Sequence, residues 1–146
     1  MEAGELEEMG PIDYVLLEWP DDPPDGEVAP IVFDLVNRGV IRVLDFAVFA
    51  KDESGNVAAI DFGELPANAS ALEEFRDASS GILGDDDLAE AAEAIDDGSL
   101  AALIVYENTW AAPFAVAVRR TGGQLVGGGR IPIQAFIAAL DAVEAA

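Results

Sequence analysis

A repeated unit limits the folds open to this chain. The chain contains two Ala-Pro pairs, Ala29-Pro30 and Ala112-Pro113. In each case a glycine, Gly39 or Gly122, follows nine positions after the proline. An apolar, strand-like segment precedes each Ala-Pro pair, and another follows each glycine. Proline suits the first turn of a helix and glycine the position just after its end. Each unit therefore predicts a strand, a helix, a glycine stop and a second strand.

Two such units can interleave into one sheet in the ferredoxin-like split βαβ arrangement. We expect an α+β sandwich of about five mostly antiparallel strands, in the order 124–128, 12–18, 100–106, 41–50 and 57–62. The turn "ESGN" makes the last two of these a hairpin. Around them we expect a disordered acidic tail over 1–9 and a single domain over 10–146, with a helical insertion at 64–97 and a C-terminal helix from "IPIQAFIAALDAV".

The segment "LAALIVY" (100–106) is apolar on both faces, whereas a half-exposed antiparallel strand alternates. It is predicted to lie at the centre of the sheet, with both faces covered. The 64–97 segment, the C-terminal helix or a second subunit could supply the second cover.

The charge is strongly acidic. Twenty-nine Asp and Glu residues face seven Lys and Arg, for a net charge of −22. Such a surface repels phosphate backbones and anionic lipid headgroups, so we expect no nucleic-acid and no membrane partner. Solubility, or adaptation to a salty cytoplasm, explains the charge as well as any function does.

Cysteine and histidine are both absent. Their absence excludes disulfides, thiol nucleophiles, Ser-His-Asp machinery and the usual zinc sites. We expect no cofactor, no metal and no catalytic residue. The N-terminus is acidic where an export signal is basic, which favours a cytoplasmic protein.

The seam between the 100–107 strand and the following helix holds the candidate contact residues. Glu107, Asn108 and Trp110 offer an acid, an amide and an aromatic ring there. Tyr106 and Arg130 complete this candidate site for a ligand or a partner. The alternative is a plain joint, in which Asn108 or Thr109 caps the helix through its side-chain oxygen.

Three further motifs have structural explanations. Glu18 and Glu107 would form an acid pair, but antiparallel strands place them at opposite edges of the predicted sheet. "PDDPPDGE" and "GDDDLAE" lack the alternating aspartates of a calcium loop, and are predicted to be a solvated turn and a helix start. "VGGGRIP" lacks the spacing of a phosphate-binding loop and is predicted to be a strand end or an edge bulge.

Four stretches carry a resemblance to a known family: "MGPIDYVLLEWP", "LVNRGVIRVLDFAVFAKDESGNV", "LIVYENTWAAPFAVAVRRTGG" and "GRIPIQ". With them the chain resembles a family of small uncharacterised actinobacterial proteins, a domain of unknown function. It is also distantly similar to stress-associated ferredoxin-like domains. The resemblance implies a cytosolic α+β domain and supplies no activity.

These observations favour a non-enzymatic domain that self-associates or binds a protein partner, in a setting that the distant resemblance suggests is stress-related. One alternative is a small-molecule sensor, with a pocket between the sheet and the inserted helices near Tyr106 and Trp110. The other is an enzyme that uses only carboxylates, Tyr14 or Tyr106.

Overall fold

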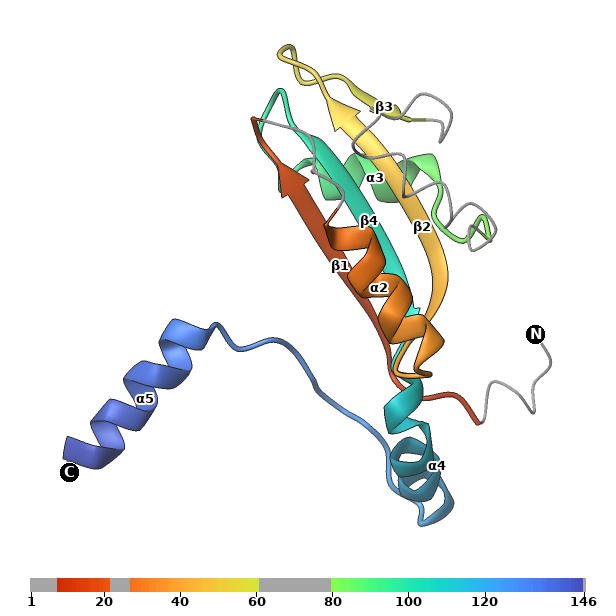
Figure 1. Ribbon diagram of the computed structural model, residues 1–146, viewed down its shortest axis with the longest axis vertical. Helices are drawn as coiled ribbons and strands as arrows, with labels where there is room; N and C mark the ends of the chain where they lie inside the picture. Colours follow the sequence, from red (N-terminus) through yellow and green to blue (C-terminus); the bar gives the residue numbers. More distant parts are fainter. Residues whose placement is uncertain (1–7, 22–26, 61–79, 146) are drawn as a thin grey trace.

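A four-stranded antiparallel sheet forms the centre of the molecule (Figure 1). The computed structural model describes residues 8–21, 27–60 and 80–145. The strands are β1 (Ile12–Trp19), β2 (Arg42–Lys51), β3 (Val57–Ala59) and β4 (Leu100–Glu107), in the order β1-β4-β2-β3. The predicted order is confirmed for these four strands, and β4 is central.

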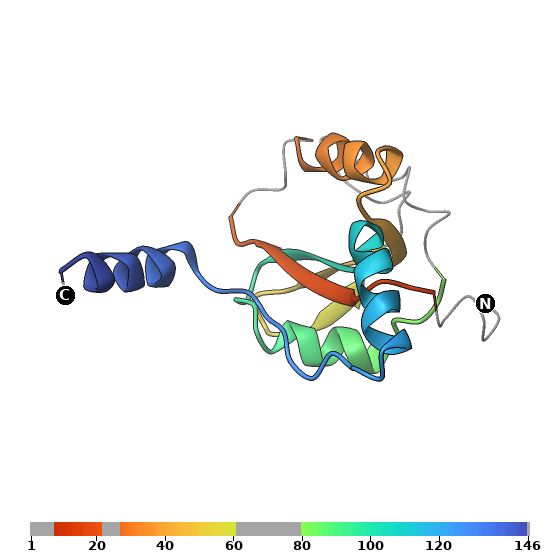
Figure 2. The same cartoon turned by 90° about the horizontal axis from the view of Figure 1, so that it is seen from below.

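Two helices cover the two faces of the sheet. Figure 2 shows α2 (Val28–Asn37) on one side and α3 (Asp85–Ala92) on the other. Under α2, Phe46, Val48, Ala102 and Ile104 form one buried cluster with Ala29 of the helix. Under α3, Phe49, Ala101 and Leu103 form a second cluster with Leu88, Ala92 and Ile95. The 64–97 segment thus supplies the cover predicted for the second face.

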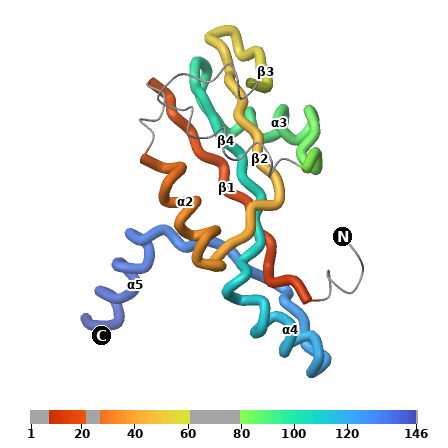
Figure 3. The backbone as a smooth tube through the Cα atoms, turned by 45° about the vertical axis from the view of Figure 1, so that its right-hand side comes forward, coloured from red at the N-terminus to blue at the C-terminus, as the bar shows by residue number. Residues whose placement is uncertain are grey.

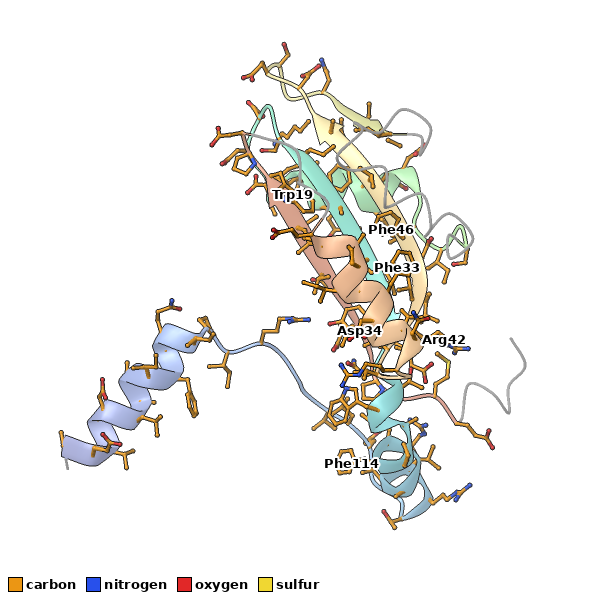
Figure 4. All side chains as sticks on the ribbon, in the orientation of Figure 1. Trp19, Phe33, Asp34, Arg42, Phe46 and Phe114 are labelled. Atoms are coloured by element: carbon orange, nitrogen blue, oxygen red, sulfur yellow. The ribbon has the colours of Figure 1, made fainter. Side chains whose placement is uncertain are left out.

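Helix α2 ends where the repeat predicts, because Gly39 takes a φ of 73° that other residues rarely adopt. Gly122 takes a φ of 86° after the second Ala-Pro helix. Not every apolar residue of α2 faces the sheet, since Ile31 is exposed. Phe33 takes the place over the sheet instead, and Figure 4 shows its ring close to Phe46 of β2.

A bulge in β2 changes the face of the sheet to which its side chains point. Val43 pairs with Tyr106 and Asp45 with Val105, so Leu44 is left over in the register. Beyond this extra residue the alternation is reversed, because each strand residue faces the side opposite to its neighbour. Val43 therefore lies on the same face as Phe46 and Val48, although strict alternation would place it on the other face.

The hairpin of β2 and β3 is closed by a local side-chain turn. The Asp52 carboxylate accepts hydrogen bonds from the backbone N–H groups of Ser54 and Asn56 at 2.9 and 2.8 Å. Gly55 supplies the positive φ, at 86°. The end of the predicted 57–62 strand and the first helix predicted within 64–97 lie outside the described residues.

The C-terminal part leaves the sheet. The short helix η3 (Thr109–Ala111) leads into α4 (Ala112–Arg120), which continues beyond the sheet, and α5 (Ile133–Ala145) stands apart at the end of an extended segment (Figures 1 and 3). We call residues 112–145 the C-terminal arm. Every residue from 121 to 145 is exposed. Among the described residues, no helix combines the length and the apolar character that crossing a bilayer needs.

The predicted fifth strand at 124–128 is wrong for this structure, since residues 123–132 form neither helix nor strand. Gly127 and Gly128 carry no side chain to pack on a neighbour, and this stretch lies away from the free edge of β1. Within the described residues the sheet therefore has four strands, and the expected ferredoxin-like arrangement is not confirmed.

The last residue of the predicted acidic tail, Met9, lies against the fold. The predicted acidic tail runs over 1–9, of which residues 1–7 lie outside the described part. Met9 and Gly10 are buried. The Arg119 guanidinium of α4 donates a hydrogen bond to the Met9 carbonyl oxygen at 2.7 Å. The ordered domain therefore includes Met9.

Candidate functional site

The predicted seam is a crossing point of three chain segments. Residues before β1, the start of β2 and the end of β4 meet there. The backbone N–H of Asn108 donates to the Pro11 carbonyl at 2.8 Å, and the backbone N–H of Trp110 donates to the Val40 carbonyl at 3.1 Å. The turn after β4 is therefore fixed by main-chain hydrogen bonds to residues far away in the sequence.

Glu107 is the buried carboxylate of this crossing point, with 4% of the residue exposed. Its Oε2 accepts the backbone N–H of Gly10 at 2.8 Å, and its Oε1 lies 2.9 Å from Nε of Arg42. A buried carboxylate costs free energy unless it is paired and hydrogen-bonded, and Glu107 has both kinds of partner. It fastens the chain before β1 to the start of β2, which gives it a structural use.

The Asn108 side chain acts differently from the prediction. It makes no helix-capping hydrogen bond, and neither does Thr109, whose buried Oγ1 has no hydrogen-bond partner. Nδ2 of Asn108 donates to Oδ2 of Asp13 at 2.8 Å, while its Oδ1 accepts from Nε1 of Trp110 at 3.3 Å. Asn108 therefore ties β1 to the seam instead of capping α4.

The other candidate residues lie close by, on different faces. Tyr106 packs against the cluster under α2, and Arg130 of the C-terminal arm donates a hydrogen bond to its hydroxyl oxygen. Trp110 is 67% exposed. The structure thus brings all five candidate residues to one end of the sheet, with Glu107 facing inward and Trp110 and Arg130 facing solvent.

Glu18 and Glu107 lie at opposite ends of their strands' pairing, as predicted. In the register of β1 and β4, Glu107 is opposite Ile12 and Glu18 is opposite Ala101. Six residues of strand separate them, about 20 Å at the usual rise. Glu18 accepts hydrogen bonds from the Asp96 backbone N–H at 2.6 Å and from the Ser99 hydroxyl at 3.2 Å.

Asp45 and Lys51 have roles that sequence reasoning missed. Asp45 is 1% exposed and accepts the backbone N–H groups of Ser80 and Leu83 at 3.0 and 2.6 Å, which anchors the chain entering α3. The sequence indicated the role of Asp45 only by an acidic residue in the middle of a largely apolar strand. Lys51 donates from Nζ to the carbonyls of Ala92 and Ile95 at 3.0 and 3.2 Å, at the C-terminal end of α3.

The start of α3 agrees with the prediction for "GDDDLAE". Its three aspartates lie in the first turn, and Oδ2 of Asp87 accepts the Gly84 backbone N–H at 2.9 Å. Most of "PDDPPDGE" lies outside the described residues. Where the chain is described, no three acidic side chains gather so that they could hold a metal ion.

Asp52 is a carboxyl group whose pKa the fold lowers. The main cause is the backbone hydrogen bond from Asn56. Desolvation, the next largest cause, raises the pKa, and the Asn56 side chain and the backbone N–H groups of Ser54 and Gly55 lower it further. These donors favour the charged carboxylate. The group closes an exposed hairpin, so its lowered pKa reflects turn geometry.

A family model matches residues 8–146, nearly the whole chain and all of its described elements. The matching model is that of DUF6325, described as a family of unknown function. No curated protein and no solved structure matches the chain. The match confirms the resemblance to a domain of unknown function, and the chain belongs to the DUF6325 family.

Proposed function

We propose that this domain is a non-enzymatic module that self-associates through its C-terminal arm. The cover that α3 gives to the second sheet face removes one earlier ground for self-association. The arm supplies a different ground. Of the fifteen large hydrophobic side chains that are exposed among the described residues, nine lie in the arm.

Helix α5 carries the most ordered part of this apolar surface. Its large apolar residues recur at helical spacing and fall on one side: Ile133, Phe136, Ile137, Leu140 and Val143. A helix of 13 residues is marginal in water without a partner for its apolar side. The exposed stripe therefore supports docking of α5 on another surface.

The free-energy terms favour a reciprocal dimer. Full burial of one such side chain stabilises by about 1.5–3 kcal/mol. A single α5 stripe would thus gain about 8–15 kcal/mol, against an association cost of about 4–15 kcal/mol. One arm barely offsets that cost. Two arms exchanged about a twofold axis double the gain, and twofold dimers are the commonest assemblies.

The carboxylates support the non-enzymatic part of the proposal. Glu18, Asp45 and Glu107 each accept hydrogen bonds that hold distant segments together. The sensor alternative gains no support, because the α3 side chains pack directly on the sheet.

Light scattering of the full chain tests the proposal. We expect twice the 15.3 kDa mass of one chain at micromolar concentration. Phe136→Glu places a charge in the α5 stripe and should give the mass of one chain. Ala138→Glu adds the same charge on the opposite side of α5 and should leave the dimer intact. A wild-type chain that stays monomeric at high concentration would overturn the proposal.

A further inference from the structure

The long free edge of the sheet is β1. It pairs with β4 on one side, and no strand of the described residues lies on its other side. The opposite edge, β3, has three residues, whereas β1 has eight. An exposed strand of this length presents backbone N–H and C=O groups that can pair with another strand. Tyr14 on this edge is 71% exposed.

Contacts at the start of the C-terminal arm direct α4 away from its own sheet. Gly10 lies against the turn so closely that a Cβ there would come within 2.3 Å of the Asn108 carbonyl oxygen. Arg119 holds α4 to Met9, and Trp110 holds the turn to Val40. Folding α4 back over its own sheet would break these contacts. The segment after α4 touches its own sheet at one end, where Arg130 donates to the Tyr106 hydroxyl, and its exposed residues are open to a second copy.

Among the residues that the structure describes, no strand pairs with the strand-like segment at 124–128. Leu125 and Val126 are exposed, Val126 at 88%. In the first repeat unit, the strand after the helix lies one strand away from the strand before it, with β4 between them. The same arrangement in the second unit would place 124–128 beside β1. Within one chain α4 continues away from that place, so the β1 edge of a second copy is the matching place.

Charge also favours a second copy of this chain as the occupant. The C-terminal arm carries three arginines and two carboxylates, a net charge of +1, whereas the residues before it carry −23. Its arginines are Arg120 and also Arg119 and Arg130, which donate hydrogen bonds to the Met9 carbonyl and the Tyr106 hydroxyl of their own chain. Electrostatic complementarity of this kind guides the approach of two surfaces.

We propose that residues 124–128 of one copy pair antiparallel with the β1 edge of a second copy, so that each copy supplies the fifth strand of the other's sheet. This inference rests on the proposed self-association and adds its geometry. The completed sheet would have the strand order expected from the sequence, with one strand contributed in trans.

Cysteine cross-linking between two differently labelled chains tests the pairing, since the native chain has no cysteine. A Tyr14→Cys chain is mixed with an isotope-labelled Leu125→Cys or Val126→Cys chain and treated with a short thiol cross-linker. We expect a product containing one chain of each kind from at least one arm position. Ala58→Cys, on the opposite edge at β3, should give no such product.

Each other outcome has a defined meaning. A double variant, Tyr14→Cys with Val126→Cys, that cross-links within one chain at high dilution would overturn exchange between copies. A dimer that gives no product with Tyr14 from either arm position would overturn the strand pairing and leave self-association standing. A monomeric wild-type chain would overturn both.

Amide hydrogen exchange provides a second readout on the unmodified chain. Alternate residues of an edge strand donate to the neighbouring strand, so we expect one of the two amides of Leu125 and Val126 to exchange at least about 100-fold slower in the wild-type dimer than in a solvated segment. Phe136→Glu should remove this protection. Unprotected amides in a wild-type dimer would overturn the pairing even if the cysteine variants failed to fold.

Discussion

Buried carboxylates hold this acidic chain together. Among the described residues, Asp45 and Glu107 are the buried acids, and each accepts backbone N–H groups from a distant segment. Hydrogen bonds to a charged acceptor are stronger than those between neutral groups. The large excess of acid therefore includes two groups that determine where the segments before β1 and α3 attach.

Glu107→Gln tests this use of charge. The amide keeps the size of the side chain but loses the charge facing Arg42, and its NH₂ group can turn toward the guanidinium. We expect the free energy of unfolding to fall by about 1.5–3 kcal/mol in urea denaturation. Glu90→Gln, on the exposed side of α3, should change it by less than about 0.5 kcal/mol. Equal effects of the two variants would contradict a structural role for Glu107.

The sequence could indicate these acids only in part. Asp45 stands among apolar residues of a predicted strand, which marks it as unusual, but its partners Ser80 and Leu83 are more than thirty residues away. The extra residue Leu44 also changes the face of the sheet on which Asp45 lies. The side chain of Asn108 was predicted to cap a helix because local rules favour that use, whereas its contact with Asp13 depends on tertiary structure.

Helix α3 is short and depends on its ends. Its N-terminal turn holds three aspartates, which suit the positive end of the helix dipole. At the other end, Lys51 reaches across from β2 to the last carbonyls and also lies 3.5 Å from Asp97. Charged groups from its own sequence and from the sheet therefore keep eight residues helical.

Lys51→Met should loosen α3 in particular. The thioether keeps most of the stem packing but removes the charge at the helix end, so we expect a loss of about 1–2 kcal/mol in unfolding free energy. Amide exchange should accelerate first in α3. Arg38→Met provides the matched control, because Arg38 also lies at a helix end but pairs with Asp34 on an open surface. An effect of Arg38→Met as large as that of Lys51→Met would contradict this account.

The elements with local signals were predicted well. Both Ala-Pro helices end before a glycine of positive φ, and the central, two-sided β4 was recognised by its apolar run. The segment 124–128 was not a strand in the structure, because a strand also needs an adjacent edge. The strand-like pattern of 124–128 indicates that this segment can pair with a sheet edge. The direction of α4 determines which edge the segment can reach.

The whole molecule combines an acidic body with an apolar, slightly basic arm. Two copies at a net charge of −22 repel each other at long range, so apolar burial has to exceed this repulsion. Salt reduces repulsion between exposed charges beyond a Debye length of about 10 Å at 0.1 M and about 3 Å at 1 M. Association through the arm should therefore depend on ionic strength.

Sedimentation at low and high sodium chloride measures this dependence. We expect the dimer dissociation constant to fall by about tenfold or more between 0.05 and 0.5 M salt, as screening removes repulsion between the two bodies. Phe136→Glu should stay monomeric at both concentrations. A dimer that weakens as salt is added would instead mean that attraction between arginines and carboxylates dominates the interface.

Lys51 is the chain's single lysine, and its amine is occupied at the end of α3. An acetyl group or a ubiquitin on that nitrogen would remove the positive charge or fill the space that the Ala92 and Ile95 carbonyls now share with it. Side-chain acylation of this protein and an intact α3 are therefore mutually exclusive states, so a conjugating enzyme would gain access only to molecules in which α3 has opened.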